Sequence, residues 1–130
     1  MNRILLLIEK SQEELKAAKI LWENEIYSAA VSRAYYCLYH ASQALLTAKN
    51  INVKSHKGLI QQFGKHFIKT GEISQEFSKI LTTAFDLRQL SDYDETVIFD
   101  KQQTEFIINN SQEFLIIAQH WLTQQNIQWN

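Results

Sequence analysis

The sequence predicts an all-α fold, an up-and-down antiparallel bundle of four to five helices. Its 130 residues include no proline and only three glycines, so the residues that usually break helices or form tight hairpins are nearly missing. Apolar residues recur at steps of three, four and seven positions through most of the chain. The connections between these periodic stretches are short, which favours antiparallel neighbours.

The length, together with a hydrophobic content of 45%, is typical of a single globular domain, which we expect to span residues 1–130. The single cysteine, Cys37, cannot form an internal disulfide. The apolar run near the N-terminus is too short for a signal peptide or a membrane span. We therefore expect a cytoplasmic protein that does not associate with membranes.

The first helix is expected from about residue 3 to residue 25. Its apolar positions at helical spacing are Leu7, Ile8, Leu15, Ala18 and Leu21. Ser11 followed by Glu14 also matches a capping box, which predicts an alternative start near residue 12. We adopt the longer helix. The second helix is expected from about Ser28 to Lys49, where asparagines and β-branched residues interrupt the pattern.

Serines mark the starts of the next two helices. Ser55 is expected to cap a third helix that stops at Gly71, a residue suited to the left-handed conformation. Ser74 is expected to cap a fourth helix over residues 75–95. A fifth helix is expected from about Lys101 to Gln125. Its apolar positions are Phe106, Ile107, Phe114, Leu115, Ala118 and Leu122.

The second helix carries an arginine and a histidine on a face that we expect to be covered. Arg33, Tyr36, Cys37 and His40 point the same way, because helical residues advance by about 100° each. An apolar stripe lies beside this face and consists of Ala34, Leu38, Ala41 and Leu45. The remaining positions form a polar strip of Ser32, Tyr35, Tyr39, Ser42 and Gln43. A covered guanidinium needs an anion as its partner.

The fourth helix offers such an anion. Arg88 and Asp92 lie one turn apart on it, and an ion pair within the helix is one interpretation. Because the acid-before-base order is the better one for helix support, Asp92 is also a candidate partner for Arg33 or His40 across the bundle.

This cluster has two interpretations. In the structural one, an ion pair and a hydrogen-bonded histidine hold two helices in register. In the functional one, Arg33 and Arg88 bind a phosphate and His40 moves a proton. His56 and Lys57, at the start of the third helix, would add donors where the helix dipole favours an anion, unless they are simply surface groups.

The charge pattern is local. The segment from Lys49 to Gly71 holds five lysines, two histidines and no acid, which indicates either a solvated surface or one that faces a phosphate. The four histidines and one cysteine show no metal-ligand spacing, and no glycine-rich phosphate loop occurs. We therefore predict no metal and no cofactor. Cys37 is expected to be a small core residue rather than a nucleophile.

Three segments together resemble the small prokaryotic branch of the HEPN family. They read "AAVSRAYYCLYHASQALL", "KSHKGLIQQFGKHFIKTGEI" and "AFDLRQLSDYDE", in this order, and the resemblance covers nearly the whole chain. It implies a helical bundle similar to the C-terminal domain of kanamycin nucleotidyltransferase, with a first helix that begins near residue 3. It also implies a homodimer that pairs, as a toxin, with a minimal nucleotidyltransferase-like antitoxin.

Active toxins of this family are metal-independent ribonucleases, whose motif is an arginine followed by four to six residues and a histidine. The resemblance assigns this arginine to Arg88, but the positions for the histidine hold Tyr93, Asp94 and Glu95. Arg33 and His40 satisfy the spacing on the second helix instead.

Three outcomes follow from this departure. The first is a ribonuclease with a rearranged site, in which Arg88, His40, Arg33 and Asp92 act on RNA. His56, Lys57, Tyr36 and Tyr93 would then bind the substrate phosphate. The second is a non-catalytic subunit that binds a nucleotide or serves as an adaptor. Separately, Tyr93 is a candidate for a modification, such as nucleotide transfer, that would silence the protein. The third is a cluster that only stabilises the fold.

Overall fold

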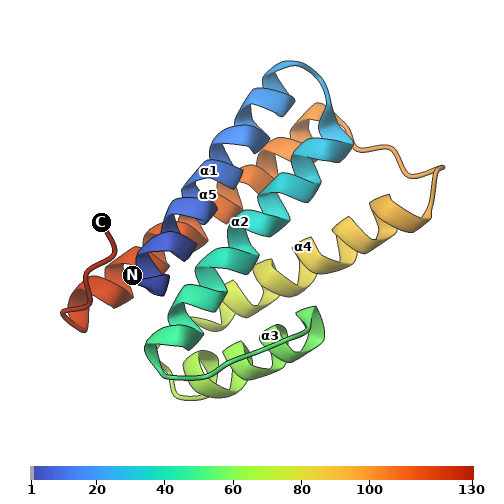
Figure 1. Ribbon diagram of the computed structural model, residues 1–130. Coiled ribbons are helices and arrows are strands. Elements are labelled where there is room, and N and C mark those ends of the chain that lie inside the picture. The colour runs from blue at the N-terminus through green and yellow to red at the C-terminus, as the bar shows by residue number, and fades with distance from the viewer. Residues whose placement is uncertain (1) are drawn as a thin grey trace.

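The computed structural model describes residues 2–130 and is all-α, as the sequence predicts (Figure 1). Its elements are α1 (Arg3–Glu23), α2 (Tyr27–Ala48), α3 (His56–Phe63), the π-helical turn η1 (Gly64–Ile68), α4 (Gln75–Tyr93) and α5 (Lys101–Gln124). The predicted boundaries agree with these to within about two residues at most ends. Within residues 2–130, no helix combines the length and apolar composition needed to cross a membrane.

The four long helices α1, α2, α4 and α5 alternate in direction along the chain, which makes an up-and-down bundle (Figure 1). The short α3 and η1 form an insertion that lies against α2 and α4 at one end. The most extensive contact is between α1 and α2, and α2 also packs along α5. By contrast, α4 diverges from α5 toward its C-terminal end and touches it little.

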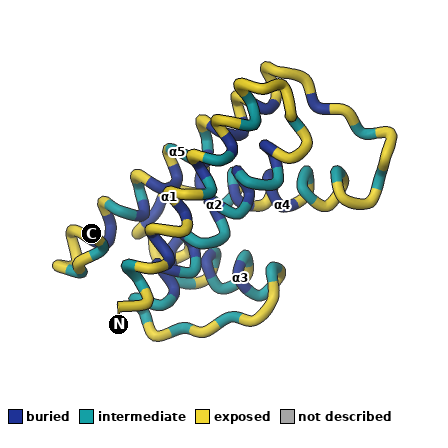
Figure 2. The backbone as a smooth tube through the Cα atoms, turned by 45° about the horizontal axis from the view of Figure 1, so that its top comes forward, coloured by how far each residue is buried: buried dark blue, intermediate teal, exposed yellow. Residues whose placement is uncertain are grey.

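The core centres on α2, which is the most buried element of the bundle (Figure 2). All four residues of its predicted apolar stripe, Ala34, Leu38, Ala41 and Leu45, are fully buried. Burial of a leucine of this kind contributes about 1.5–3 kcal/mol to the free energy of unfolding. Cys37 is buried as well, in agreement with the prediction of a core residue.

The predicted polar strip of α2 is wrong at two positions. Tyr35 and Ser42 are both fully buried, because α2 is covered by α1, α3, α4 and α5 together and has little free surface. The Ser42 hydroxyl satisfies its hydrogen-bonding need within the helix by donating to the carbonyl of Leu38 at 2.7 Å.

The ends of the helices follow their capping residues. Asn2 caps α1 by accepting from the backbone N–H of Ile4, so the longer first helix is correct. Ser11 lies inside this helix, where its hydroxyl donates to the carbonyl of Cys37 at 2.7 Å. The alternative start near residue 12 is therefore wrong.

The predicted caps of the later helices lie at the expected positions, but Ser74 lacks the expected capping hydrogen bond. Ser55 caps α3 by accepting from the N–H of Gly58 at 2.9 Å, and Gly71 has a φ of 79°. Ser74 occupies the N-cap position of α4 but makes no capping hydrogen bond with its side chain. Asp100, which was not among the predicted caps, forms a capping box with Gln103 at the start of α5.

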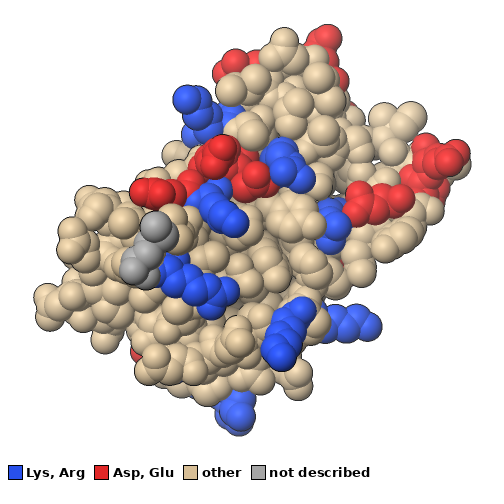
Figure 3. Space-filling view, in the orientation of Figure 1, with Lys and Arg blue, Asp and Glu red and all other residues tan. Residues whose placement is uncertain are grey.

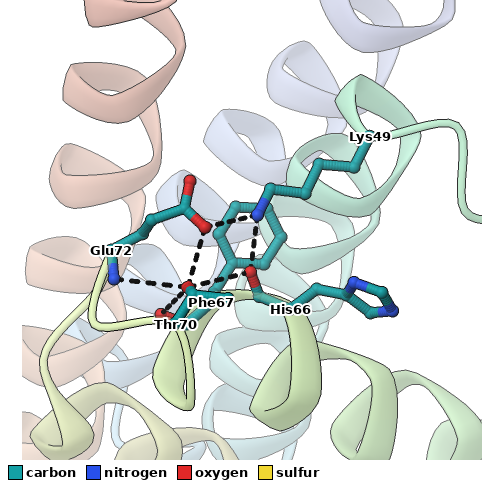
Figure 4. Close-up of polar contacts among 5 residues, drawn as sticks. All are labelled: Lys49, His66, Phe67, Thr70 and Glu72. Carbon is teal, nitrogen blue, oxygen red and sulfur yellow. Dashed lines mark hydrogen bonds and ion pairs between the residues drawn. The ribbon is translucent and has the colours of Figure 1, made fainter.

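The basic segment between Lys49 and Gly71 is partly neutralised by the fold (Figure 4). The Lys49 ammonium forms an ion pair with Glu72 and donates to the carbonyl of His66 at 2.6 Å. It also lies 4.3 Å from the ring centroid of Phe67, within the range of a cation–π interaction. The hydrogen bond from this ammonium lowers the pKa of Glu72 below its usual value. Lys49 therefore stabilises the insertion and is already paired.

Candidate functional site

Arg33 is anchored on α1 and not on α4. Its Nη1 lies 3.0 Å from Oε2 of Glu14 and donates to Oε1 of the same carboxylate at 3.2 Å. The predicted pairing of Arg33 with Asp92 is therefore wrong. Glu14 sits one turn after Ser11 on α1, directly across from Arg33, because α1 and α2 pack along most of their length. The guanidinium also lies over Tyr36, with Cζ 5.2 Å from the ring centroid.

Arg88 approaches the same tyrosine from the opposite helix. It forms an ion pair with Asp92 within α4, at 3.2 Å between Nη2 and Oδ2. Of the two interpretations of Asp92, the pair within the helix is thus the correct one. The Arg88 guanidinium lies over Tyr36 with Cζ 5.1 Å from the centroid, and over Tyr35 at 5.7 Å. Its Nε is buried and has no hydrogen-bond partner among residues 2–130.

The face of Tyr36 thus lies within cation–π distance of two guanidiniums. Arg33 on α2 and Arg88 on α4 thus lie near the same tyrosine ring, although their helices are not neighbours in sequence. Each guanidinium presents a planar fork of donors that suits a phosphate, but each already pairs with a carboxylate, Glu14 or Asp92, that a phosphate would have to displace.

His40 faces the α1 side of this surface. Its nearest aromatic rings are Tyr39 at 5.6 Å and Tyr36 at 6.2 Å between centroids. Burial lowers the pKa of its imidazole, the neighbouring Gln43 opposes this shift, and the charges of Lys10 and Arg33 lower the pKa by smaller amounts. Its Nδ1 is buried and has no hydrogen-bond partner within the described residues.

His56 faces the α4 side. As the first residue of α3, it is placed against α2 by the Ser55 cap, and its Nδ1 lies 2.6 Å from the hydroxyl of Tyr35. The imidazole packs against Tyr39 at 4.7 Å and stacks on Phe85 at 5.9 Å between centroids. Burial lowers its pKa, and the charge of Arg88 lowers it further.

These side chains form one group, which we call the arginine–tyrosine cluster. It consists of Arg33, Tyr35, Tyr36, Tyr39, His40, His56, Phe85 and Arg88. Three of its members, Tyr35, Tyr39 and Phe85, were not among the sequence-predicted site residues. Nothing in the sequence marks Tyr35 as buried. The predicted position of His56 at the start of the third helix was the signal that could have pointed to the side chains around it.

Two predicted phosphate-binding residues lie outside the cluster. Tyr93 is 85% exposed at the end of α4, and Lys57 is exposed on α3. Neither contacts a member of the cluster through a hydrogen bond, an ion pair or ring stacking within the described residues. In the view of Figure 3, acidic side chains lie at the top, left of the centre and at the right-hand end, basic side chains lie beside them, and the lower part carries mainly basic ones.

A separate groove of about 790 Å³ lies where α4 diverges from α5. Its floor is apolar and includes Leu38 and Ile107, and its rim carries the two-thirds-exposed Phe106 together with Lys79 and Glu113. None of the residues of the arginine–tyrosine cluster lines this groove. Among residues 2–130, no group of three His, Cys, Asp or Glu side chains could hold a metal ion.

The fold and the site define a class of protein: a small helical bundle in which arginines, tyrosines and histidines from three helices meet at one surface. The chain belongs to the HEPN family, since the HEPN domain model matches residues 4–121.

Two relatives agree with this membership, and one solved structure shares the fold. The chain is 38% identical to the protein named "Putative toxin MJ0142" of Methanocaldococcus jannaschii, over 93% of this chain and 82% of that protein. It is 42% identical to "Putative toxin MJ0605" of the same organism, over 88% of this chain and 84% of that protein. The crystal structure of TT1696 from Thermus thermophilus superimposes with a TM-score of 0.79 over 94% of this chain and all of that one, at 15% identity. This last similarity concerns the fold alone.

Proposed function

We propose that the protein is the toxin subunit of a cytoplasmic two-component toxin–antitoxin module and acts as a metal-independent endoribonuclease. The observation that carries this proposal is the placement of two guanidiniums near Tyr36, with the imidazole centroids of His40 and His56 6.2 Å and 6.3 Å from its ring centroid. Two homologues bear toxin names, and Arg88 is the residue that matches the arginine of the family motif.

The cluster provides the groups that RNA cleavage without a metal requires. A base must take the proton of a ribose 2′-hydroxyl, and cations must stabilise the charge that builds up on phosphorus. Imidazoles with lowered pKa values are neutral near pH 7, so both His40 and His56 are in the base form there. Tyr36 and Tyr39 offer aromatic surfaces on which unpaired bases stack.

A second candidate function is a non-catalytic subunit that binds a nucleotide or acts as an adaptor for its partner. The observation that favours it is the ion pair of Arg88 with Asp92, which already neutralises the arginine of the motif. In addition, the positions where the family places its histidine hold Tyr93, Asp94 and Glu95. A carboxylate paired with Arg88 would have to be displaced by the incoming phosphate.

The partner in this proposal is a minimal nucleotidyltransferase-like antitoxin, and the toxin itself is a homodimer. Exposed apolar side chains support an assembly of some kind: Ile98 is 87% exposed and Phe106 is 66% exposed. Co-expression with the protein encoded beside it, followed by co-purification and light scattering, would test both parts.

The central experiment combines expression alone with RNA cleavage in the presence of EDTA. We expect growth arrest and cleavage by the wild type, and a loss of roughly a hundredfold or more in Arg88→Ala. Lys16→Ala, on the exposed face of α1, is the matched control and should keep full activity. Harmless expression and intact RNA, with nucleotide binding retained, would instead establish the non-catalytic subunit.

A further inference from the structure

We propose that His56, and not His40, is the histidine that works with Arg88 at a single phosphate site, and that Tyr35 is its positioning residue. This inference rests on the proposed function, since it assigns the acid–base group of that reaction. The motif histidine that is missing from α4 would thus be supplied by the start of α3.

The first argument is that one buried side chain joins His56 to Arg88. The hydroxyl of Tyr35 lies 2.6 Å from Nδ1 of His56, and the Arg88 guanidinium lies 5.7 Å from the centroid of the Tyr35 ring. Tyr35 is fully buried on α2, so it has little freedom to move away from either group.

The second argument is that His40 lacks these connections. The charged groups that act on it, Lys10 and Arg33, belong to α1 and to the α1-facing side of α2. Arg88 is the charged group that acts on His56. His56 also packs on Phe85, one turn before Arg88 on α4, whereas the ring neighbours of His40 are tyrosines of its own helix.

The third argument is that the imidazole of His56 is held in place before any substrate binds. Tyr39 and Phe85 pack against its ring, and the Ser55 cap fixes the backbone from which it projects. Preorganisation of this kind is what a catalytic base requires, because a displacement of an ångström costs up to about a hundredfold in rate. The hydrogen bonds of His56 within the described residues involve Nδ1 only, so Nε2 is free to act on a substrate.

The step that this geometry supports is transesterification of RNA. Nε2 of His56 takes the proton of the ribose 2′-hydroxyl, and the 2′-oxygen forms a bond to phosphorus. The bond from phosphorus to the 5′-oxygen breaks, and that oxygen takes a proton from water. The products are a 2′,3′-cyclic phosphate and a 5′-hydroxyl, while Arg88 stabilises the charge of the phosphorane. Loss of the imidazolium proton to solvent restores the base.

Tyr35 remains a neutral hydroxyl throughout, because burial raises its pKa. The proposed base requires the tautomer in which Nδ1 of His56 carries the proton and donates it to the Tyr35 oxygen, because only this tautomer leaves Nε2 with the free electron pair. A phenylalanine at this position would keep the packing of the ring and remove only the hydrogen bond.

The test compares three variants with the wild-type protein in an RNA cleavage assay across pH 4.5–8.5. We expect His56→Asn to lose roughly a hundredfold or more, as for the removal of a general base. The matched variant His40→Asn should lose much less than His56→Asn, because the inference makes His56 and not His40 the partner of Arg88. Tyr35→Phe should lose about tenfold, within the range for a misplaced catalytic group, and should shift the acidic limb of the pH–rate profile. A merely structural role for Tyr35 would not move that limb.

A second measurement separates this inference from the proposed function. Inorganic phosphate is titrated into the protein while the imidazole resonances are followed by NMR. Phosphate should shift the His56 signals in the wild type but not in Arg88→Ala, whether or not RNA is cleaved. If no RNA is cut but this shift occurs, the ribonuclease function fails and the phosphate site stands. Unmoved His56 signals, or cleavage that depends on His40 and not on His56, would overturn the inference.

Discussion

The guanidinium of Arg33 contacts both carboxylate oxygens of Glu14, at 3.0 Å and 3.2 Å from Nη1, so that an ion pair ties α2 to α1. The two side chains are 40% and 19% exposed, which places the pair at the edge of the core. Glu14 thereby fixes the position from which Arg33 reaches over Tyr36.

Removal of this carboxylate should destabilise the protein modestly. We expect Glu14→Gln to lower the free energy of unfolding by about 0.5–1 kcal/mol, because the half-exposed Arg33 is partly solvated. A double-mutant cycle with Arg33→Met, measured by urea denaturation, should give a coupling energy of similar size.

The matched control for this prediction is Asp92→Asn, on the other arginine. Its carboxylate is 41% exposed and forms a pair within one helix, with the arginine preceding the acid. We expect a change of at most a few tenths of a kcal/mol. A larger effect from Asp92→Asn than from Glu14→Gln would contradict our assignment of the ion pair that joins two helices.

The fold could be predicted because its determinants are local. The absence of proline and the helical spacing of apolar residues both act within a few turns, and so do the caps at Ser55 and Gly71. The predicted start at Ser74 was correct in position, although its side chain makes no capping hydrogen bond. The cap of α5 at Asp100 was not predicted, although its capping box with Gln103 is also a local pattern.

The site was harder to predict because its partners are far apart in sequence. Helical periodicity places Arg33 and His40 on one face, but it does not show which acidic residue of another helix lies opposite them. Glu14, the partner of Arg33, was therefore not predicted. Tyr35 was assigned to a polar strip because its hydroxyl is polar, whereas α3 and α4 cover it. A tyrosine buried with its hydroxyl on His56 is a tertiary feature that the spacing along α2 does not contain.

The serine that starts α3 should matter for both stability and the site. Ser55→Ala removes the acceptor for the N–H of Gly58, which costs about 1 kcal/mol for a cap of this type. Because His56 is the next residue, we also expect a change in its imidazole NMR signals. Ser55→Asp should restore both properties, since aspartate is an equally good cap. Unchanged thermal unfolding of Ser55→Ala would argue against the cap.

Cys37 should be unreactive in the folded protein. It is fully buried, and burial raises the pKa of its thiol to about 12, so almost no thiolate exists at neutral pH. We expect negligible labelling by Ellman's reagent in buffer and one thiol labelled per chain in denaturant. Fast labelling under native conditions would show that α1 and α2 separate near Ser11, which contacts Cys37.

The ion pair of Lys49 with Glu72 should make stability depend on pH in the acidic range. The pKa of Glu72 is lowered in the folded state, mainly by the hydrogen bond from Lys49, so the unfolded chain binds the proton more readily. The contribution of this pair is therefore complete above the unfolded pKa of about 4.5 and is lost as pH falls through the lower, folded value.

Glu72→Gln should reduce stability at pH 7 and flatten its decline below pH 4.5. Equal pH dependence in thermal unfolding of the wild type and Glu72→Gln would mean that other carboxylates control the acid limb. Lys49→Met is the complementary variant: it keeps the apolar contact with Phe67 but removes the charge, and it should reproduce the same flattening.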